Sequence, residues 1–183
     1  MGFIMGGIMK TIKTERFLIR AYELEDSNKV YKVLNTKEIS DMMPAIPHPY
    51  PRDKVEWWIN FVNDRISEGR AYEFGIFLND NTYIGNCELN IVEEDKKSAY
   101  IGYFIDPKYW GNGYATEAST EMIKFGFEQL NLNKIIGRCK KENIRSKKVL
   151  EKLGFKYEKT VNFKSSHLSS NVEVVYYFFE KVM

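Results

Sequence analysis

Apolar residues recur along this chain with two different periods, and these periods predict its helices and strands. Residues 52–68 carry an apolar stripe at helical spacing, formed by Val55, Trp58, Ile59, Val62 and Ile66. Two more helices are predicted over residues 115–130 and 142–153, and another follows Asp26 or Ser27, either of which can cap it. Runs rich in β-branched and aromatic residues predict strands over residues 14–22, 72–78, 83–92, 98–105, 133–140, 155–163 and 172–180.

The order of these elements, β-α-α-β-β-β-α-β-α-β-β, is typical of an α/β (α+β) protein. It predicts a single mixed, partly parallel central sheet of about seven strands, with about four helices on both faces. The turn residues at 79–82 predict a hairpin between the second and third strands. Four of the five prolines fall in residues 41–51, where we expect an ordered loop.

Residues 1–10 are apolar and glycine-rich, and we expect a disordered or loosely ordered leader before a single domain over residues 11–183. This leader is too short to cross a membrane and lacks the basic start and cleavage site of a secretory signal. We therefore expect no membrane contact. Cys87 and Cys139 lie in strand-like runs without metal-ligand spacing, which predicts buried free thiols in a reducing cytosol and a cytoplasmic protein.

The composition is that of an ordinary soluble globular protein, with 44% hydrophobic and 28% charged residues. A net charge of +2 is too small to favour nucleic acid by bulk attraction, so we expect no direct nucleic-acid partner. The two histidines, His48 and His167, do not have the spacing of a zinc site. We expect no metal, and no Ser/His/Asp arrangement is visible.

The most informative stretch follows the predicted strand 98–105. Gly111 and Gly113 open the next predicted helix, which gives the order strand, glycine loop, helix. Glycine lets the backbone turn tightly and lets a ligand approach closely. The first amides of a helix have no partner within it and lie at the positive end of its dipole, so a phosphate fits there. A plain tight turn is the alternative.

The residues around this loop resemble the GNAT family of N-acetyltransferases. Trp110-Gly111-Asn112-Gly113-Tyr114-Ala115 is similar to the family's pyrophosphate loop, Arg/Gln-x-x-Gly-x-Gly/Ala, except that Trp stands where Arg or Gln is usual. The longer string over residues 109–118 and the string over residues 143–155 resemble the RimJ/RimL branch, which acetylates N-termini of ribosomal proteins. The resemblance covers the chain from about residue 11 and implies the GNAT fold, whose sheet is splayed between the strands predicted at 98–105 and 133–140.

This resemblance implies acetyl-CoA as the acetyl donor. The pantetheine arm would lie in the gap of the sheet beside Phe104 and Ile105, and the Ile105 amide would stabilise the oxyanion, an effect worth roughly 3 kcal/mol. Asn143 resembles the family residue that binds the pantetheine, with a helix cap as the alternative. Lys147 and Lys148 are candidates for the 3′-phosphate, or else belong to a solvated helix face. The pyrophosphate would lie on the backbone amides of Gly111, Asn112, Gly113, Tyr114, Ala115 and Thr116.

Acetyl transfer needs a neutral amine as the attacking group. Glu88, on the polar face of the strand 83–92, is the candidate base, with an ordinary surface carboxylate as the alternative. Many family members place a tyrosine acid on the helix at 142–153, but Leu150 stands at the matching position here. Ser146 resembles the serine of the RimJ/RimL branch and is the remaining polar group nearby. We therefore expect Glu88, Ser146 and the Ile105 amide to carry catalysis.

The acceptor side would be lined by Tyr50, Trp57 and Trp58, although Trp57 also suits the edge of the core. We expect the acceptor to be the N-terminal α-amine of a protein or peptide, such as a ribosomal protein. A small-molecule amine (a polyamine, an amino acid or an antibiotic) is the alternative acceptor, and a non-catalytic CoA-binding sensor is the alternative class of protein. The enzyme is expected to be a monomer or a homodimer.

Overall fold

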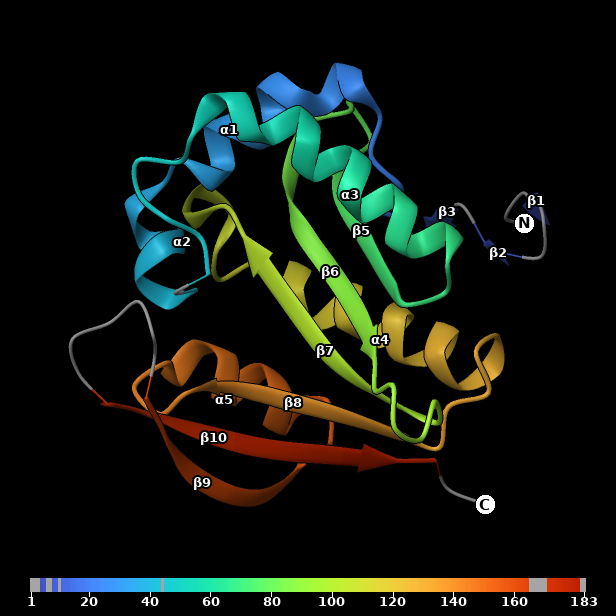
Figure 1. The fold of residues 1–183 in the computed structure, drawn as a ribbon, viewed down its shortest axis with the longest axis vertical. Helices are drawn as coiled ribbons and strands as arrows, with labels where there is room; N and C mark the ends of the chain where they lie inside the picture. Colours follow the sequence, from blue (N-terminus) through green and yellow to red (C-terminus); the bar gives the residue numbers. More distant parts are fainter. Residues whose placement is uncertain (1–3, 6–7, 10, 44, 165–170, 182–183) are drawn as a thin grey trace.

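The computed structural model describes residues 4–5, 8–9, 11–43, 45–164 and 171–181. Within these residues, eight strands form one sheet in the spatial order β3-β4-β5-β6-β7-β8-β10-β9 (Figure 1). Neighbouring strands are antiparallel, except that β7 and β8 run parallel. The strands are β3 (Thr11–Lys13), β4 (Phe17–Arg20), β5 (Ala71–Leu78), β6 (Tyr83–Ile91), β7 (Ser98–Ile105), β8 (Lys134–Lys140), β9 (Lys156–Lys164) and β10 (Asn171–Glu180). Separately, β1 (Ile4–Met5) and β2 (Ile8–Met9) pair with each other.

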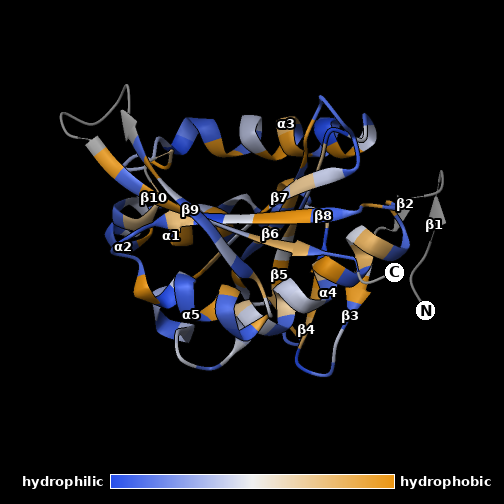
Figure 2. Cartoon of the chain, turned by 90° about the horizontal axis from the view of Figure 1, so that it is seen from below, coloured by the Kyte–Doolittle hydropathy of each residue, from blue (hydrophilic) through white to orange (hydrophobic). Residues whose placement is uncertain are grey.

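Helices cover both faces of this sheet. Figure 2 shows α3 on one side of the strands and α4 and α5 on the other. The predicted mixed sheet between two layers of helices is confirmed, with eight strands in place of about seven and five α-helices in place of about four within the described chain. The helices are α1 (Ser27–Leu34), α2 (Lys37–Met42), α3 (Val55–Ser67), α4 (Tyr114–Glu128) and α5 (Ile144–Lys152).

The additional helix, α2, lies just before the proline-rich segment. It has six residues, and Ile39 is its single buried side chain, so it carries no apolar stripe from which a helix could be predicted. Lys37 and Asp41 form an ion pair one turn apart on its exposed side. The loop that we expected from Asp41 therefore begins only at Met43, after the helix ends.

Apolar side chains pack in two clusters, one on each face of the sheet. The cluster with Met122 of α4 includes the buried thiol of Cys87. The other cluster lies under α1 and α3 and includes Ile59 and Phe77, both fully buried. Both cysteines are free thiols, and Cys139 is half-buried rather than buried. The strands that carry the candidate site are thus fixed from both sides.

The sheet splits in its middle, between the two parallel strands. Residues 98–101 of β7 pair with residues 134–137 of β8, and the pairing goes no further. Beyond that point β7 stays paired with β6 as far as Ile105, and β8 stays paired with β10 as far as Lys140. The splay that the family resemblance implied is therefore present, and it begins at Gly102. In Figure 1 the two strands diverge toward the end of the sheet near α2.

Some sequence predictions fall on residues that the structure does not describe. These are most of the expected leader, Pro44 of the proline loop, and the loop over residues 165–170 with His167. The division into a leader and one domain therefore stays a prediction. In the part of the chain that is described, no helix combines the length and the apolarity needed to cross a lipid bilayer.

Candidate active site

A tight loop joins β7 to α4 at the edge of the split. The side chain of Asp106 accepts a hydrogen bond from the Lys108 N–H (3.0 Å), which caps the short 3-10 turn η3 (Pro107–Tyr109). Gly111 and Gly113 follow with φ of +80° and +78°, a left-handed conformation that residues with a Cβ seldom adopt. The glycine pair is therefore what allows the chain to turn directly into α4.

In the part of the chain that is described, a row of backbone N–H groups in this loop has no protein partner. No residue of the described ranges accepts a hydrogen bond from the N–H groups of residues 111–116, and the first paired amide is that of Glu117, which donates to the Gly113 carbonyl (3.0 Å). A Cβ built on Gly111 would meet no atom within 4 Å, so the space beside the loop is open. These donors lie at the positive end of α4, and they can hold a pyrophosphate without displacing a protein contact.

Arg16, at the edge of the sheet formed by β3 and β4, contacts this loop and the start of α4. It lies in the turn between β3 and β4, where we predicted the start of a longer strand. Its Nη1 donates to the Asn112 carbonyl (2.9 Å), its Nε donates to Glu117 Oε2 (2.7 Å), and its guanidinium lies 4.4 Å from the Tyr114 ring centroid. Glu117 is therefore neutralised by an ion pair beside the phosphate loop, in addition to its place in the first turn of α4.

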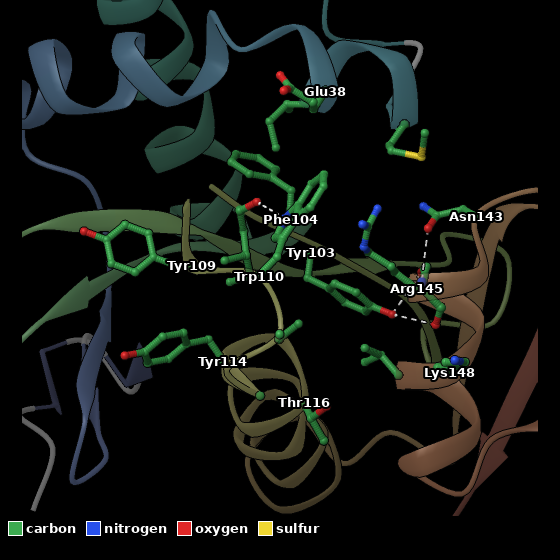
Figure 3. Close-up of a pocket in the computed structure, with 18 of the residues that line it drawn as sticks. Glu38, Tyr103, Phe104, Tyr109, Trp110, Tyr114, Thr116, Asn143, Arg145 and Lys148 are labelled. Carbon is green, nitrogen blue, oxygen red and sulfur yellow. Dashed lines mark hydrogen bonds between the residues drawn. The ribbon is translucent and has the colours of Figure 1, made fainter. Parts of the chain in front are cut away.

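A cavity of about 360 Å³ opens between this loop, the end of β7, α2 and the start of α5. Figure 3 shows Trp110 and Tyr114 on one side of it and Asn143, Arg145 and Lys148 on the other. Its volume lies in the usual range of ligand pockets. The predicted cofactor-binding residues that line it are Phe104, Ile105, Gly111, Gly113, Tyr114, Ala115, Thr116, Asn143 and Lys148, whereas Asn112 and Lys147 do not.

The backbone groups of Ile105, at the end of β7, face the split. The Phe104 carbonyl faces β6, since a Cβ on Gly85 would lie 2.1 Å from it, and the Asp106 N–H donates to Ile84 of β6 (2.7 Å). Successive residues of a strand point their backbone groups to opposite edges, so those of Ile105 point toward β8, where pairing has ended. The Trp110 indole N–H donates to the Ile105 carbonyl (2.6 Å), which gives Trp110 a role in place of the usual Arg or Gln.

The start of α5 brings two hydroxyl groups together in the cavity. Asn143 caps the helix, because its Oδ1 accepts from the Ser146 N–H (3.1 Å). The Tyr103 hydroxyl lies 3.0 Å from Ser146 Oγ and 3.2 Å from the Ser146 carbonyl. Burial raises the pKa of the Tyr103 phenol, against a smaller opposing effect of the bond to Ser146. Tyr103 was not predicted as a site residue, because its 43-residue separation from Ser146 is bridged only by the fold.

Other positions of α5 face either the core or the cavity. Leu150 is 1% exposed and packs on Gly137 of β8, so this position offers no acid, as its sequence indicated. Arg145 lines the cavity with its guanidinium 4.4 Å from the Trp110 ring centroid. Arg145 and Lys152 are cations of the cavity that the sequence analysis missed, since an exposed basic residue carries no signal of what it faces.

Comparison with known proteins decides the family. The chain matches the acetyltransferase (GNAT) domain family over residues 16–156. It belongs to the GNAT family. It is 34% identical to the uncharacterized N-acetyltransferase p20 of Bacillus licheniformis over 154 residues. The matched region covers 82% of this chain and 84% of that protein. The chain is therefore an N-acetyltransferase, as the loop motif predicted.

Two solved structures show the same GNAT architecture. A GNAT-family acetyltransferase from Bacillus anthracis superposes with a TM-score of 0.82 at 26% identity, over 93% of this chain and 98% of that chain. RimL, a ribosomal L7/L12 α-N-protein acetyltransferase solved in complex with coenzyme A, superposes with a TM-score of 0.83 at 16% identity, over 93% and 98% of the two chains. The second likeness is one of fold alone.

On the α1–α3 side of its sheet, this GNAT enzyme places two carboxyl groups side by side. Glu88 of β6 lies directly opposite Glu73 of β5, and Asn86 Nδ2 donates to Glu73 Oε1 (2.7 Å). Glu73 is 8% exposed and Glu88 is half-buried. Burial and the neighbouring Glu88 raise the pKa of Glu73 well above its usual range, while Arg65 and Asn86 oppose this. Glu73 was not predicted as a site residue, because it lies within an otherwise apolar run.

The three aromatic residues predicted for the acceptor side do not line the cavity of the phosphate loop. Tyr50 and Trp58 pack against the core cluster under α1 and α3, with the Trp58 ring 5.0 Å from Tyr22. Trp57 is 60% exposed and stacks on Phe61 with a centroid distance of 5.3 Å. The alternative that Trp57 belongs to the core edge is therefore wrong. A role for these three residues in acceptor binding stays a proposal.

Proposed function

We propose that this enzyme transfers the acetyl group of acetyl-CoA to the N-terminal α-amine of a protein or peptide, such as a ribosomal protein. The observation that carries the proposal is the row of N–H groups at residues 111–116 that have no partner in the described structure, beside the end of β7, whose edge toward β8 is open. Acetyl-CoA supplies an acetyl group on a thioester and carries a pyrophosphate and a 3′-phosphate. A site with helix-start donors, nearby cations and an open strand edge fits this molecule.

Each part of the donor has matching residues in the cavity. The amides of residues 111–116 bind the pyrophosphate, and Arg145 and Lys148 supply positive charge for the 3′-phosphate. Asn143 uses its oxygen as a cap, which leaves its amide nitrogen to bind the pantetheine arm. The Ile105 N–H, directed at the split, donates to the thioester carbonyl oxygen as negative charge develops there, an effect worth about 3 kcal/mol.

The leaving sulfur needs one proton at the end of the transfer. A thiol has an ordinary pKa near ~8.5, so a hydrogen-bond donor is sufficient and a strong acid is not required. The Ser146 hydroxyl provides this donor, the Tyr103 hydroxyl 3.0 Å away holds it in place, and solvent returns the proton that Ser146 gives up after CoA has left. This pair takes over the role that a tyrosine at position 150 has in other family members.

The acid–base chemistry of the acceptor favours an N-terminal α-amine over a lysine side chain. Its pKa is near ~8, against ~10.4 for lysine, so more than ~10²-fold more of it is neutral at pH 7. One carboxylate, Glu88, is then enough to take the amine proton as the nitrogen attacks. Polyamines require clustered carboxylates, and the only run of three acidic residues in the sequence, at residues 93–95, lies in an exposed turn where Asp95 accepts hydrogen bonds from Ser98.

A thiol-release assay with acetyl-CoA tests this proposal. Peptides with free N-termini, the same peptides with blocked N-termini, a lysine side-chain amine and spermidine serve as acceptors. We expect release of CoA with the free peptides only. Turnover with spermidine alone would overturn the acceptor, and tight acetyl-CoA binding without release for any amine would identify a CoA sensor instead.

A further inference from the structure

The carboxyl pair on the α1–α3 side of the sheet carries an inference that rests on the proposed function and extends it. Glu73 and Glu88 occupy directly opposite positions on β5 and β6, with their side chains on the same face. Opposite residues of an antiparallel pair have Cβ atoms about 4.5–5.5 Å apart, so two ionised carboxylates there would repel strongly. Such a pair is stable when it holds one proton between its members.

The surroundings decide which carboxyl holds the proton. Glu73 is 8% exposed, and one of its oxygens accepts from Asn86 Nδ2, which leaves the other oxygen for its neighbour. Glu88 is half-buried and closer to solvent. Burial and the charge of Glu88 raise the pKa of Glu73 well above its usual range. The proton therefore resides on Glu73, and Glu88 carries the negative charge.

The other groups facing Glu73 do not change this assignment. Arg65 of α3 is the one cation among them in the described structure, and its guanidinium is already bonded to Asn90 Oδ1 (2.6 Å). The rest are uncharged at neutral pH, because burial raises their pKa values. They are the phenols of Tyr22, Tyr50 and Tyr83.

Gly102 fixes where the Glu88 carboxylate lies. A Cβ on Gly102 would be 2.4 Å from Glu88 Oε1, so the carboxylate lies directly over the backbone of this glycine. Gly102 is the first residue of β7 beyond the last pair with β8. The charge of Glu88 is thus held at the apex of the split, on the strand that ends three residues later at Ile105.

We propose that Glu73 is a positioning residue: as a neutral acid it donates a hydrogen bond to Glu88 and holds the Glu88 carboxylate over Gly102, ready to accept the proton of the acceptor amine. The pair then presents one negative charge to the amine, in keeping with a substrate of a single positive charge. The proton taken by Glu88 leaves to solvent before the next turnover, and Glu73 keeps its own proton throughout.

Four variants test this role. Glu73→Leu removes the hydrogen bond, and a carboxylate misplaced by about 1 Å lowers kcat by roughly 10²-fold. Glu73→Gln keeps a donor toward Glu88 but cannot ionise, so we expect it to restore most of the turnover that Glu73→Leu loses. Glu88→Gln removes the base and lowers kcat by roughly 10²–10⁴-fold. Glu93→Gln, in an exposed turn, is the surface control and keeps the wild-type kcat.

The measurements are kcat and KM for a peptide amine, calorimetric affinity for acetyl-CoA, and the melting temperature of each variant. Acetyl-CoA affinity should be unchanged in all of them, because the pair lies outside the phosphate loop. A Glu73→Gln variant as slow as Glu73→Leu would overturn the proposal, since it would mean that Glu73 must ionise. So would a Glu73→Leu variant with the wild-type kcat.

A second readout does not depend on activity. Carbon-13 NMR of glutamate-labelled enzyme, with Glu73→Gln used to assign the Glu73 carboxyl signal, reports its protonation. We expect Glu73 to remain protonated at pH 7, and an ionised Glu73 at that pH would refute the proposal. If the wild type acetylates no amine, the proposed function fails on its own, while this spectrum still decides whether the pair holds its proton.

Discussion

Replacing Gly113 with leucine perturbs the phosphate loop without removing a charged group. Gly113 has φ of +78°, and a Cβ there would lie 3.8 Å from Arg16 Nη2, so the new side chain starts without overlap. The left-handed conformation costs a residue with a Cβ about 1–2 kcal/mol. For a domain of this size each kcal/mol lowers Tm by roughly 2–4 °C, so we expect a loss of roughly 2–8 °C.

The loss of acetyl-CoA affinity should exceed what this strain explains. The leucine side chain would cover the N–H groups beside it or force the loop into another conformation, and either change removes donors from the pyrophosphate. Each hydrogen bond to a charged group contributes about 1.5–3 kcal/mol. Losing two of them raises Kd by roughly 10²–10⁴-fold, measured by calorimetric titration with acetyl-CoA.

Gly69→Leu is the matched control, because Gly69 follows α3 with φ of +68° and a Cβ there would approach only Tyr72 Oη, at 3.5 Å. It carries the same kind of strain at a position outside the phosphate loop. We expect a similar loss of Tm and an unchanged Kd. A Gly113→Leu variant that binds acetyl-CoA like the wild type would refute the reasoning, and so would equal weakening by Gly69→Leu.

Three further changes test separate parts of the account. Ser146→Ala should lower kcat more than acetyl-CoA affinity, and unchanged thiol-release kinetics would exclude Ser146 from the mechanism. Arg16→Ala leaves Glu117 unpaired beside the loop, so acetyl-CoA should bind several-fold more weakly, about 1 kcal/mol for this partly exposed pair; equal affinity by calorimetry would contradict this. The neutral form of Glu73 is favoured in the fold, so its stabilising contribution is complete below the ordinary pKa of 4.5 and is lost as pH rises toward its raised pKa. Glu73→Gln should therefore gain Tm relative to the wild type with rising pH, whereas a constant difference in thermal melts would argue against a raised pKa.

Much of the fold could be predicted because its core elements carry strong local patterns. The strand at residues 98–105 was predicted with its observed bounds, since an apolar run is followed directly by Asp-Pro. The hairpin of β5 and β6 and the start of α4 were placed within one residue of their observed positions. α2 and β3 escaped prediction because each is short and buries a single side chain, so neither shows a period.

The candidate site, like the fold, has parts that local sequence patterns predict and parts that they do not. The phosphate loop is local, and its glycines and the following helix are visible in the sequence. Tyr103, Arg16 and Glu73 are not, because each acts through a partner that only the fold brings near: Ser146, Glu117 and Glu88, at separations of 43, 101 and 15 residues. For Trp57 the local pattern was ambiguous, since an aromatic residue beside an apolar stripe can point either to the core or to solvent. In the structure its side chain points to solvent.

The central claim is that the unpaired N–H groups at residues 111–116 bind the diphosphate of coenzyme A. Titration of nitrogen-15-labelled enzyme with coenzyme A, followed by amide NMR, tests it most directly. We expect the amide protons of residues 111–116 and of Ile105 to shift downfield as they gain acceptors, with a smaller change at Glu117, whose N–H is already bonded within the protein. Saturation with coenzyme A that leaves the signals of residues 111–116 in place would contradict the claim.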